Sequence, residues 1–237
     1  MNTKGNALFL ILIAVALFAA LSYAITQSGR GGGNIDREQA AITAANITQY
    51  GSSLERGLQR MQIVNGCSDT QISFWHDSNG DGTEDASDNY YNSSSPTNHS
   101  CHLFDANGGG VTLRPASDFG ADHFIFPYDV CVSGAGTGYY PACASDGTSS
   151  EDIIFGLGEI DQAVCQAIVN NMGDGTINTD HGNSWIPTRY FTGTFSEGFS
   201  ISLLGGGSGV TLPYSNCVLA ESAPAGRYNY YHVLKAR

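Results

Sequence analysis

Apolar and polar positions divide the chain into three parts. Residues 7–25 form an apolar run without a charged side chain. From Ile35 to Met61, apolar residues recur at three- to five-residue steps, which predicts an amphipathic helix. Beyond residue 65, short apolar and aromatic stretches alternate with glycine-rich segments, a pattern typical of strands joined by loops. We therefore expect two helical segments followed by an α+β domain.

The apolar run predicts a membrane segment. At about 1.5 Å per residue, its nineteen residues nearly cross a hydrocarbon core of roughly 30 Å. Lys4 precedes the run, so we expect a cytoplasmic N-terminus and an exported remainder. Three interpretations are open: a plain membrane anchor, the first half of a filament-forming helix, or a signal peptide cleaved after Ser22-Tyr23-Ala24. The run is longer than the roughly 7–15 apolar residues usual in signal peptides.

The residues before this run resemble a prepilin processing site. Lys4-Gly5 stands directly before the apolar residues, as in type IV prepilins, where prepilin peptidase cleaves after the glycine. The start Gly5-Asn6-Ala7-Leu8 is similar to that of minor pilins and of the tip pseudopilin of type II secretion. The resemblance implies cleavage between Gly5 and Asn6. Pilins also have a similar two-part first helix.

The pattern and the resemblance together predict the domain organisation. Four glycines between residues 29 and 33 disfavour a helix there, because each costs about 1 kcal/mol relative to alanine. The predicted parts are a leader over 1–5, a transmembrane helix over 6–28, a glycine-rich hinge over 29–34, an amphipathic helix over 35–64, and an exported α+β domain over 65–237 in which this helix packs on an antiparallel sheet.

One position departs from the pilin pattern. Most pilins carry a glutamate five residues after the cleavage point, and this chain has Leu10 there. In the family, the glutamate neutralises the N-terminal amine of the next subunit inside the filament, where an unpaired charge is costly. The resemblance therefore implies a scarce, terminal subunit of a pilus or secretion filament. Its partners would be the bacterial inner membrane, prepilin peptidase and other pilin-like subunits, the last through residues 6–28.

Two other function classes are open. The chain could be a single-pass, calcium-stabilised binding or adhesive domain that never assembles, with Tyr90-Tyr91 and Tyr139-Tyr140 as contact residues. A membrane-tethered hydrolase is the third hypothesis. In each case the domain would be periplasmic or extracellular.

The charge distribution excludes a nucleic-acid surface. The net charge is −12, and residues 61–226 hold nineteen acidic side chains against only Arg114 and Arg189. Phosphate binding needs clustered lysine and arginine, so we expect no nucleic-acid partner. The acidity fits either solubility of an exported protein or binding of divalent cations.

Six cysteines, all beyond the apolar run, predict up to three disulfides in an oxidising compartment. Spacing alone leaves fifteen connectivities open. Cys131 and Cys143 flank a glycine-rich loop and are the favoured pair. Cys67–Cys101 would close the acidic loop region, and Cys165–Cys217 would join a helix to the C-terminal sheet.

Residues 77–88 resemble the calcium loop of EF-hands and dockerins. Oxygen ligands at alternating positions let a tight loop surround a hard cation, and Gly82 stands at the sharp turn. The last position is an aspartate in place of the usual bidentate glutamate, and the flanks do not look helical. An Asx-rich turn is the alternative, since the same residues favour turns. The predicted calcium ligands are Asp77, Asn79, Asp81, Thr83, Asp85 and Asp88.

No catalytic motif is present. The sequence lacks a nucleophile elbow, a zincin helix and a phosphate-binding loop, so we do not expect an enzyme. His99, Cys101 and His102 are neighbours, but a zinc site would need a fourth ligand at workable spacing. Asp122-His123 precedes an apolar stretch, which favours a structural role.

Short apolar stretches predict the elements of the domain. Gly173 would end one helix over 159–172. The predicted strands are 71–76, 101–104, 111–113, 123–128, 190–195, 199–204, 210–212, and an antiparallel pair over 217–220 and 228–234.

Overall fold

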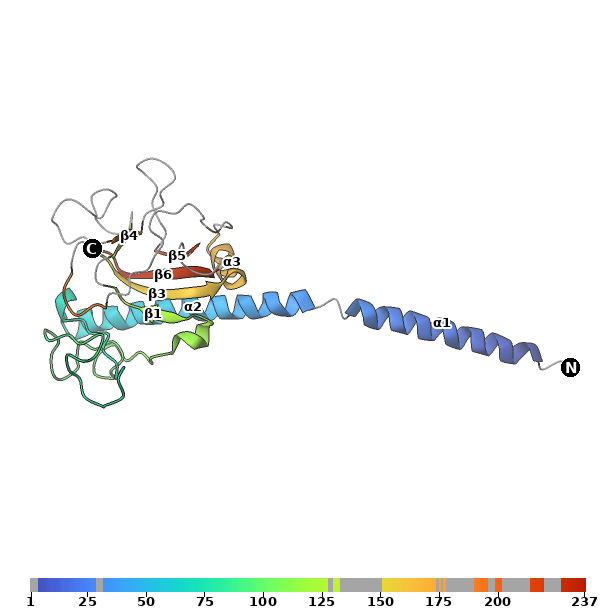
Figure 1. The fold of residues 1–237 in the computed structure, drawn as a ribbon, viewed down its shortest axis with the longest axis horizontal. Coiled ribbons are helices and arrows are strands. Elements are labelled where there is room, and N and C mark those ends of the chain that lie inside the picture. Colours follow the sequence, from blue (N-terminus) through green and yellow to red (C-terminus); the bar gives the residue numbers. More distant parts are fainter. Residues whose placement is uncertain are drawn as a thin grey trace, which may run out of the picture. The chain divides into compact units, whose positions relative to one another are not determined.

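A computed structural model describes residues 4–28, 32–127, 130–132, 151–173, 175, 177, 190–195, 199–201, 214–219 and 227–237. It divides into two compact units, Met1–Ala40 and Ala41–Arg237. The elements, labelled in Figure 1, are α1 (Lys4–Ser28), α2 (Gly32–Val64), β1 (His123–Ile125), β2 (Val130–Val132), β3 (Ile153–Asp161), α3 (Gln162–Asn171), β4 (Phe199–Ile201), β5 (Ser215–Leu219) and β6 (Arg227–Lys235). Two 3₁₀ turns cover Asp69–Gln71 and Ala116–Phe119.

The predicted first helix is present as α1. Its side chains are described over residues 9–23, and all of them are exposed. Among the described residues, no helix is long and apolar enough to cross a membrane. The transmembrane span over 6–28 therefore stays a prediction.

Helix α2 begins at Gly32, three residues before the predicted start at Ile35. The first four N–H groups of a helix have no intrahelical partner, so glycine is tolerated better there than in the interior. The predicted apolar face is confirmed from Ile47 to Met61, whereas Ile42 is 64% exposed and the side chain of Ile35 lies outside those described. In the second unit, the buried residues of this face are Ala44, Ile47, Tyr50, Leu54, Leu58 and Met61.

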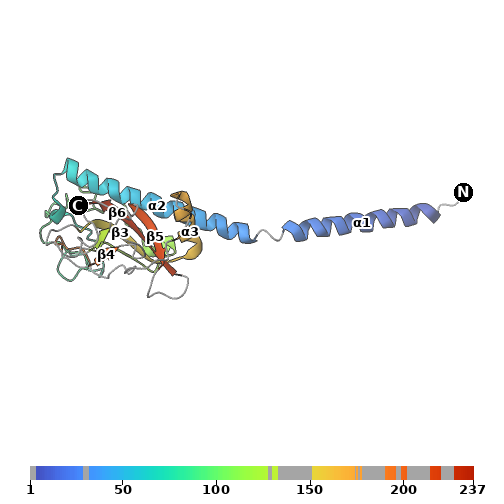
Figure 2. The same cartoon turned by 90° about the horizontal axis from the view of Figure 1, so that it is seen from above.

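An antiparallel sheet in the order β1-β3-β6-β5 forms the centre of the second unit. Residues 41–64 of α2 run along this sheet (Figures 1 and 2). The Tyr50 ring meets Phe155 of β3 edge-on at 5.6 Å, and the side chain of Glu55 lies 3.4 Å from His232 of β6. The α+β class is thereby confirmed.

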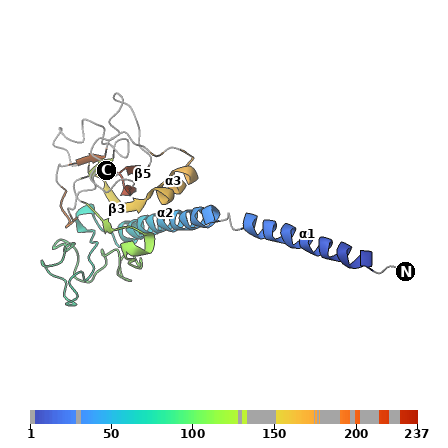
Figure 3. The same ribbon diagram turned by 45° about the vertical axis from the view of Figure 1, so that its right-hand side comes forward.

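Helix α3 covers the same face of the sheet. Cys165 of α3 is bonded to Cys217 of β5. Cys217 is the cross-strand partner of Tyr230, and cross-strand partners share a face. Tyr230 faces α2, since its hydroxyl lies 3.3 Å from the position a Cβ would take at Gly51. Figure 3 shows α3 beside the sheet from a third direction.

The opposite face of the sheet carries a second apolar layer. Ile154, Tyr231 and Val233 of the sheet are buried with Val130 and Val132 of β2. Strand β2 pairs in parallel with β4, which makes a separate two-stranded sheet. The sheet is therefore covered on both faces, and its strands read as apolar runs rather than strict alternations.

The sequence missed β3, one of the two central strands of the sheet. Strand β3 lies between β1 and β6, yet its glycines at 156 and 158 resemble a loop. Gly158 is opposite His123, and an added Cβ there would lie 2.1 Å from the imidazole. The glycine thus leaves room for the His123 imidazole beside β3. The helix predicted from residue 159 begins at Gln162, because β3 extends to Asp161.

Several predicted strands are wrong. Residues 71–76 and 101–104 contribute a single isolated bridge, Ser73 to His102. Residues 111–113 and 190–195 are not strands either. Their apolar side chains fill the core from irregular backbone, as Phe74, Leu103 and Phe191 do. The final antiparallel pair is confirmed as β5 and β6, whereas residues 210–212 lie outside the described residues.

Two of the three predicted disulfides are present. Cys67–Cys101 has a Cα–Cα distance of 5.8 Å, and Cys165–Cys217 one of 5.6 Å. The favoured pair, Cys131 with Cys143, lies outside the residues whose side chains are described.

Candidate functional site

The segment between α2 and β1 carries most of the candidate chemistry. The Cys67–Cys101 disulfide fastens it close to the C-terminal end of α2. Backbone hydrogen bonds of 2.8 Å from Ser73 N to Cys101 O and 2.9 Å from Leu103 N to Ser73 O hold its two arms together. Irregular backbone is thus fixed by covalent and hydrogen-bonded contacts in place of a regular strand ladder.

The predicted calcium loop folds as a series of Asx turns. Asp77 accepts hydrogen bonds from Gly80 N at 2.7 Å and Gly82 N at 3.0 Å. Asn79 accepts from Asp81 N, and Asp81 from Thr83 N. These side-chain oxygens already satisfy backbone N–H groups, as the alternative interpretation expected.

The last predicted ligand of the loop, Asp88, is buried. Asp88 is only 5% exposed and accepts hydrogen bonds from Trp75 Nε1 at 2.7 Å and Ser78 Oγ at 3.1 Å. The bond from Trp75 lowers the pKa of the Asp88 carboxyl. Asp85 binds the backbone N–H and hydroxyl of Ser87, which lowers its pKa too. Calcium binding by this loop stays a prediction.

A different group converges beside the loop. Glu84, His99 and His102 offer ligand atoms that all lie within 4.8 Å of one another. Glu84 Oε2 is 3.3 Å from His99 Nε2, and Glu84 Oε1 is 3.5 Å from His102 Nε2. The two imidazole rings stack with centroids 4.4 Å apart. Within the described ranges, this is the one cluster of three or more such side chains.

Burial sets the electrostatics of this cluster. His102 is 2% exposed, and burial, aided by the nearby His99, lowers its pKa to about 4. Burial also raises the pKa of Glu84, an effect that His99 partly offsets. His99 Nδ1 lies 3.3 Å from Asp105 Oδ2. His102 is consequently a neutral imidazole at pH 7.

The sequence pointed to the histidines without finding their partner. Cys101, suggested as a ligand neighbour, is held in the disulfide. Glu84 stands at loop position 8, which no calcium pattern assigns, and it is fifteen residues from His99. Only the fold of the loop brings it to the histidines.

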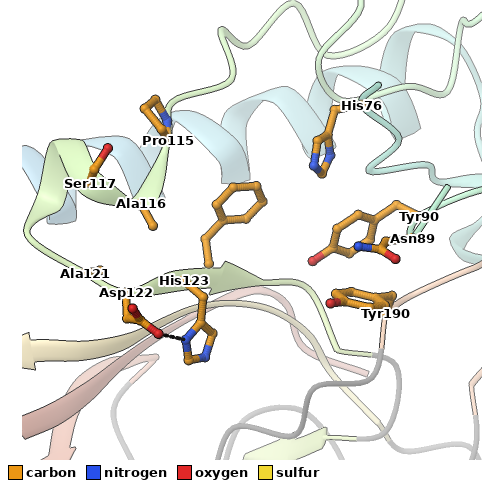
Figure 4. Close-up of a pocket in the computed structure, with 11 residues that line it drawn as sticks. His76, Asn89, Tyr90, Pro115, Ala116, Ser117, Ala121, Asp122, His123 and Tyr190 are labelled. Atoms are coloured by element: carbon orange, nitrogen blue, oxygen red, sulfur yellow. Dashed lines mark ion pairs between the residues drawn. The ribbon is translucent and has the colours of Figure 1, made fainter. Parts of the chain in front are cut away.

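A cleft of about 600 Å³ lies on another part of the domain, drawn in Figure 4. His76, Tyr90 and Tyr190 line one side of it, and His123 with Asp122 lines another. Tyr90 is 2% exposed, and its hydroxyl accepts a hydrogen bond from Phe126 N. Its main role is therefore in the core, which corrects the expectation of an exposed contact residue. Tyr139-Tyr140 lies outside the described residues.

The cleft holds no assembled catalytic triad among its described residues. His123 Nδ1 lies 3.6 Å from Asp122 Oδ2, as the dashed line in Figure 4 marks. The side chain of Ser117 lies apart from the His123 ring in that view, and no hydrogen bond joins them. Figure 4 instead shows Tyr90 and Tyr190 close together, with ring centroids 5.0 Å apart. The arrangement suits contact with a flat or apolar group.

Comparisons with known proteins give no further constraint. No protein-family model matches the chain, and neither a curated protein nor a solved structure is significantly similar to it. The functional argument therefore rests on the residues and their geometry.

Proposed function

We propose that the chain is a minor pilin or pseudopilin-like subunit, anchored in the bacterial inner membrane by its N-terminal helix. One observation carries the proposal. Helix α1 exposes large apolar side chains on all sides, including Phe9 at 62%, Leu17 at 65% and Phe18 at 74%. Water is a poor environment for such a surface, since burial is worth about 25 cal/mol per Å². A bilayer, and later the packed helices of a filament, would supply the apolar surroundings.

The second helix supports the same proposal. Residues 41–64 of α2 pack on an antiparallel sheet, as the two-part first helix of a pilin does. The prepilin-like residues Gly5 and Asn6 lie in the first turns of α1. Cleavage between them would place Leu10 five residues into the mature chain.

A membrane-anchored binding domain is the second candidate, and the cleft favours it. Tyr190 and His76 are half-buried at its wall and offer aromatic surface to a ligand. An aromatic wall with a few polar groups, here Asp122, is typical of ligand-binding pockets. The anchor would then need no processing and no neighbouring subunit.

The mature N-terminus discriminates these candidates. Mass spectrometry of the chain purified from membranes should report Asn6 for a pilin, Met1 for an anchor and Ile25 for a cleaved signal peptide. Gly5→Leu should block processing while the chain still inserts. Ala14→Leu, an apolar change inside the helix, is the matched control and should be processed normally. Unchanged processing of the Gly5 variant would remove the pilin proposal.

A further inference from the structure

We propose that Glu84, His99 and His102 form a zinc site with one carboxylate and two imidazole ligands. The site is separate from the six predicted calcium ligands. It also does not depend on the filament proposal.

The ligand atoms lie at separations close to those of a metal site. With zinc–nitrogen and zinc–oxygen bonds of about 2.1 Å, neighbouring ligand atoms in a tetrahedral site lie about 3.4 Å apart. Glu84 Oε2 lies 3.3 Å from His99 Nε2, and Glu84 Oε1 lies 3.5 Å from His102 Nε2. Each imidazole thus faces a different carboxylate oxygen, and the two rings stack at 13°. One ring has to turn for both Nε2 lone pairs to meet one ion, which needs only side-chain rotation.

Asp105 supplies the outer contact typical of metal-bound histidine. Its Oδ2 lies 3.3 Å from His99 Nδ1, on the opposite side of the ring from Glu84. A carboxylate there holds the Nδ1–H tautomer and leaves the Nε2 lone pair for the metal. Asp105 is itself fixed, because its other oxygen accepts a hydrogen bond from Asn107 N.

His102 is the buried member of the cluster. It is 2% exposed, and its Nδ1 has no hydrogen-bond partner in the described part of the chain. Its Nε2 faces Glu84 at 3.5 Å. A metal bond at Nε2 would give this buried nitrogen a strong partner, since a buried polar atom without one is costly.

The backbone around the histidines is fixed in advance. Cys101, between them, is tied to Cys67. Gly109 N donates to His102 O at 2.9 Å, and a Cβ at Gly108 would lie 2.0 Å from the same oxygen. His99 has φ 57°, a left-handed conformation uncommon outside glycine, asparagine and aspartate. Such fixed, strained positions suit a site that must exist before its ligand arrives.

One coordination position would be open. Glu84 and His99 line a pocket of about 290 Å³ together with Tyr91, Asn92 and Thr97. Three protein ligands beside a solvent-filled pocket leave the fourth position to water or to a ligand atom. The imidazoles favour zinc over calcium, which takes oxygen ligands.

The test measures binding of Zn²⁺ alone to the full-length chain in detergent, by isothermal titration calorimetry. Visible absorption of the Co²⁺ form reports imidazole coordination independently. Wild type should bind one zinc ion per chain. Glu84→Gln and His99→Asn should each bind at least about 100-fold more weakly, and Asp105→Asn about 10–100-fold more weakly. Asparagine is chosen at His99 because it tolerates the left-handed backbone.

His123→Gln is the matched control, since it removes a half-exposed histidine outside the cluster. It should leave the zinc affinity and the Co²⁺ spectrum unchanged. Circular dichroism establishes that each variant is folded. No stoichiometric binding by wild type, or full affinity in either folded ligand variant, overturns the proposal.

Discussion

Two adjacent carboxyl groups, Glu151 and Asp152, are buried directly before β3. Asp152 has no exposed surface, and its oxygens accept backbone hydrogen bonds from Val132 at 2.8 Å and Arg237 at 3.0 Å. Burial raises its pKa from 3.8 to about 7, although these hydrogen bonds and the Arg237 charge oppose the shift. The Asp152 side chain thus links β2 to the C-terminal residue through hydrogen bonds, although its burial disfavours the ionised carboxylate.

This shift predicts a pH dependence of stability. The folded state holds the Asp152 proton between pH 4 and 7, while the unfolded state releases it, so stability falls as pH rises through this window. The Asp152→Asn side chain cannot ionise. Between pH 4 and 7 the free energy of unfolding of this variant should therefore fall by roughly 2–4 kcal/mol less than that of wild type. Thermal melts of both chains at pH 4 to 8 measure the difference. Asp122→Asn, which removes an exposed acid, is the control, and its melting temperature should change with pH as that of wild type does. The same pH dependence in Asp152→Asn as in wild type would contradict the prediction.

At the scale of elements, α2 packs through its glycines. A Cβ at Gly57 would lie 2.5 Å from Val111 Cγ2 and 2.8 Å from Leu103 Cδ1. Gly57 looks like a weak point in the sequence, but it lies where the loop segment that carries Leu103 and Val111 approaches the helix.

Gly57→Ala should therefore destabilise the domain. Alanine gains about 1 kcal/mol in helix propensity, whereas overpacking costs about 1–3 kcal/mol. We expect a lower melting temperature, by a few degrees for a net loss of about 1 kcal/mol. Gln49→Ala, on the exposed side of α2, is the control and should change the melting temperature little. A rise in the Gly57 variant would show that Val111 and Leu103 move aside without cost.

The calcium loop gives a second prediction for this scale. Calcium would have to compete for carboxylate oxygens that already accept hydrogen bonds. Asp77 and Asp81 accept them from backbone N–H groups, and Asp88 accepts one from Trp75. Binding should therefore be weak, in the range of extracellular modules at about 10⁻⁴–10⁻³ M. Millimolar Ca²⁺ should raise the melting temperature of wild type, and Asp77→Asn should abolish the rise. No shift with either calcium or chelator would sink this prediction.

The sequence predicted elements well where their pattern was local. Helix α2 and the β5–β6 pair follow from periodicity and turn residues, whereas the two described disulfides agree with pairings that cysteine spacing alone left open. Strand β3 was missed because Gly156 and Gly158 resemble a loop, and the close approach of His123 to Gly158 appears only in the fold. The Glu84–His99–His102 cluster was missed for a related reason, since it forms only when an irregular loop folds back on itself.

At the scale of the whole molecule, α1 and the acidic part of the chain differ in surface chemistry. The described side chains of α1 are exposed and, apart from Ser22 and Tyr23, apolar, while residues 61–226 carry nineteen acidic side chains against two basic ones. Like-charged domains repel one another unless cations or basic neighbours lie between them. Repeated packing of identical copies is therefore unfavourable at low ionic strength, which agrees with a scarce subunit more than with a repeating one.

The last prediction concerns assembly, and it rests on the proposed function. Leu10 is 60% exposed on α1 and stands where a pilin glutamate would pair with a neighbour's amine. An uncharged residue there leaves that amine unpaired, so the chain should form a small fraction of any filament. Leu10→Glu should increase incorporation, as measured by quantitative mass spectrometry of purified filaments. Leu12→Glu is the control, because it adds the same charge at a position that does not face the neighbour's amine. A charge there costs about 3 kcal/mol in a bilayer, so this variant should be incorporated less than wild type. Finding this chain as the dominant subunit of a fibre would show that Leu10 has no such role.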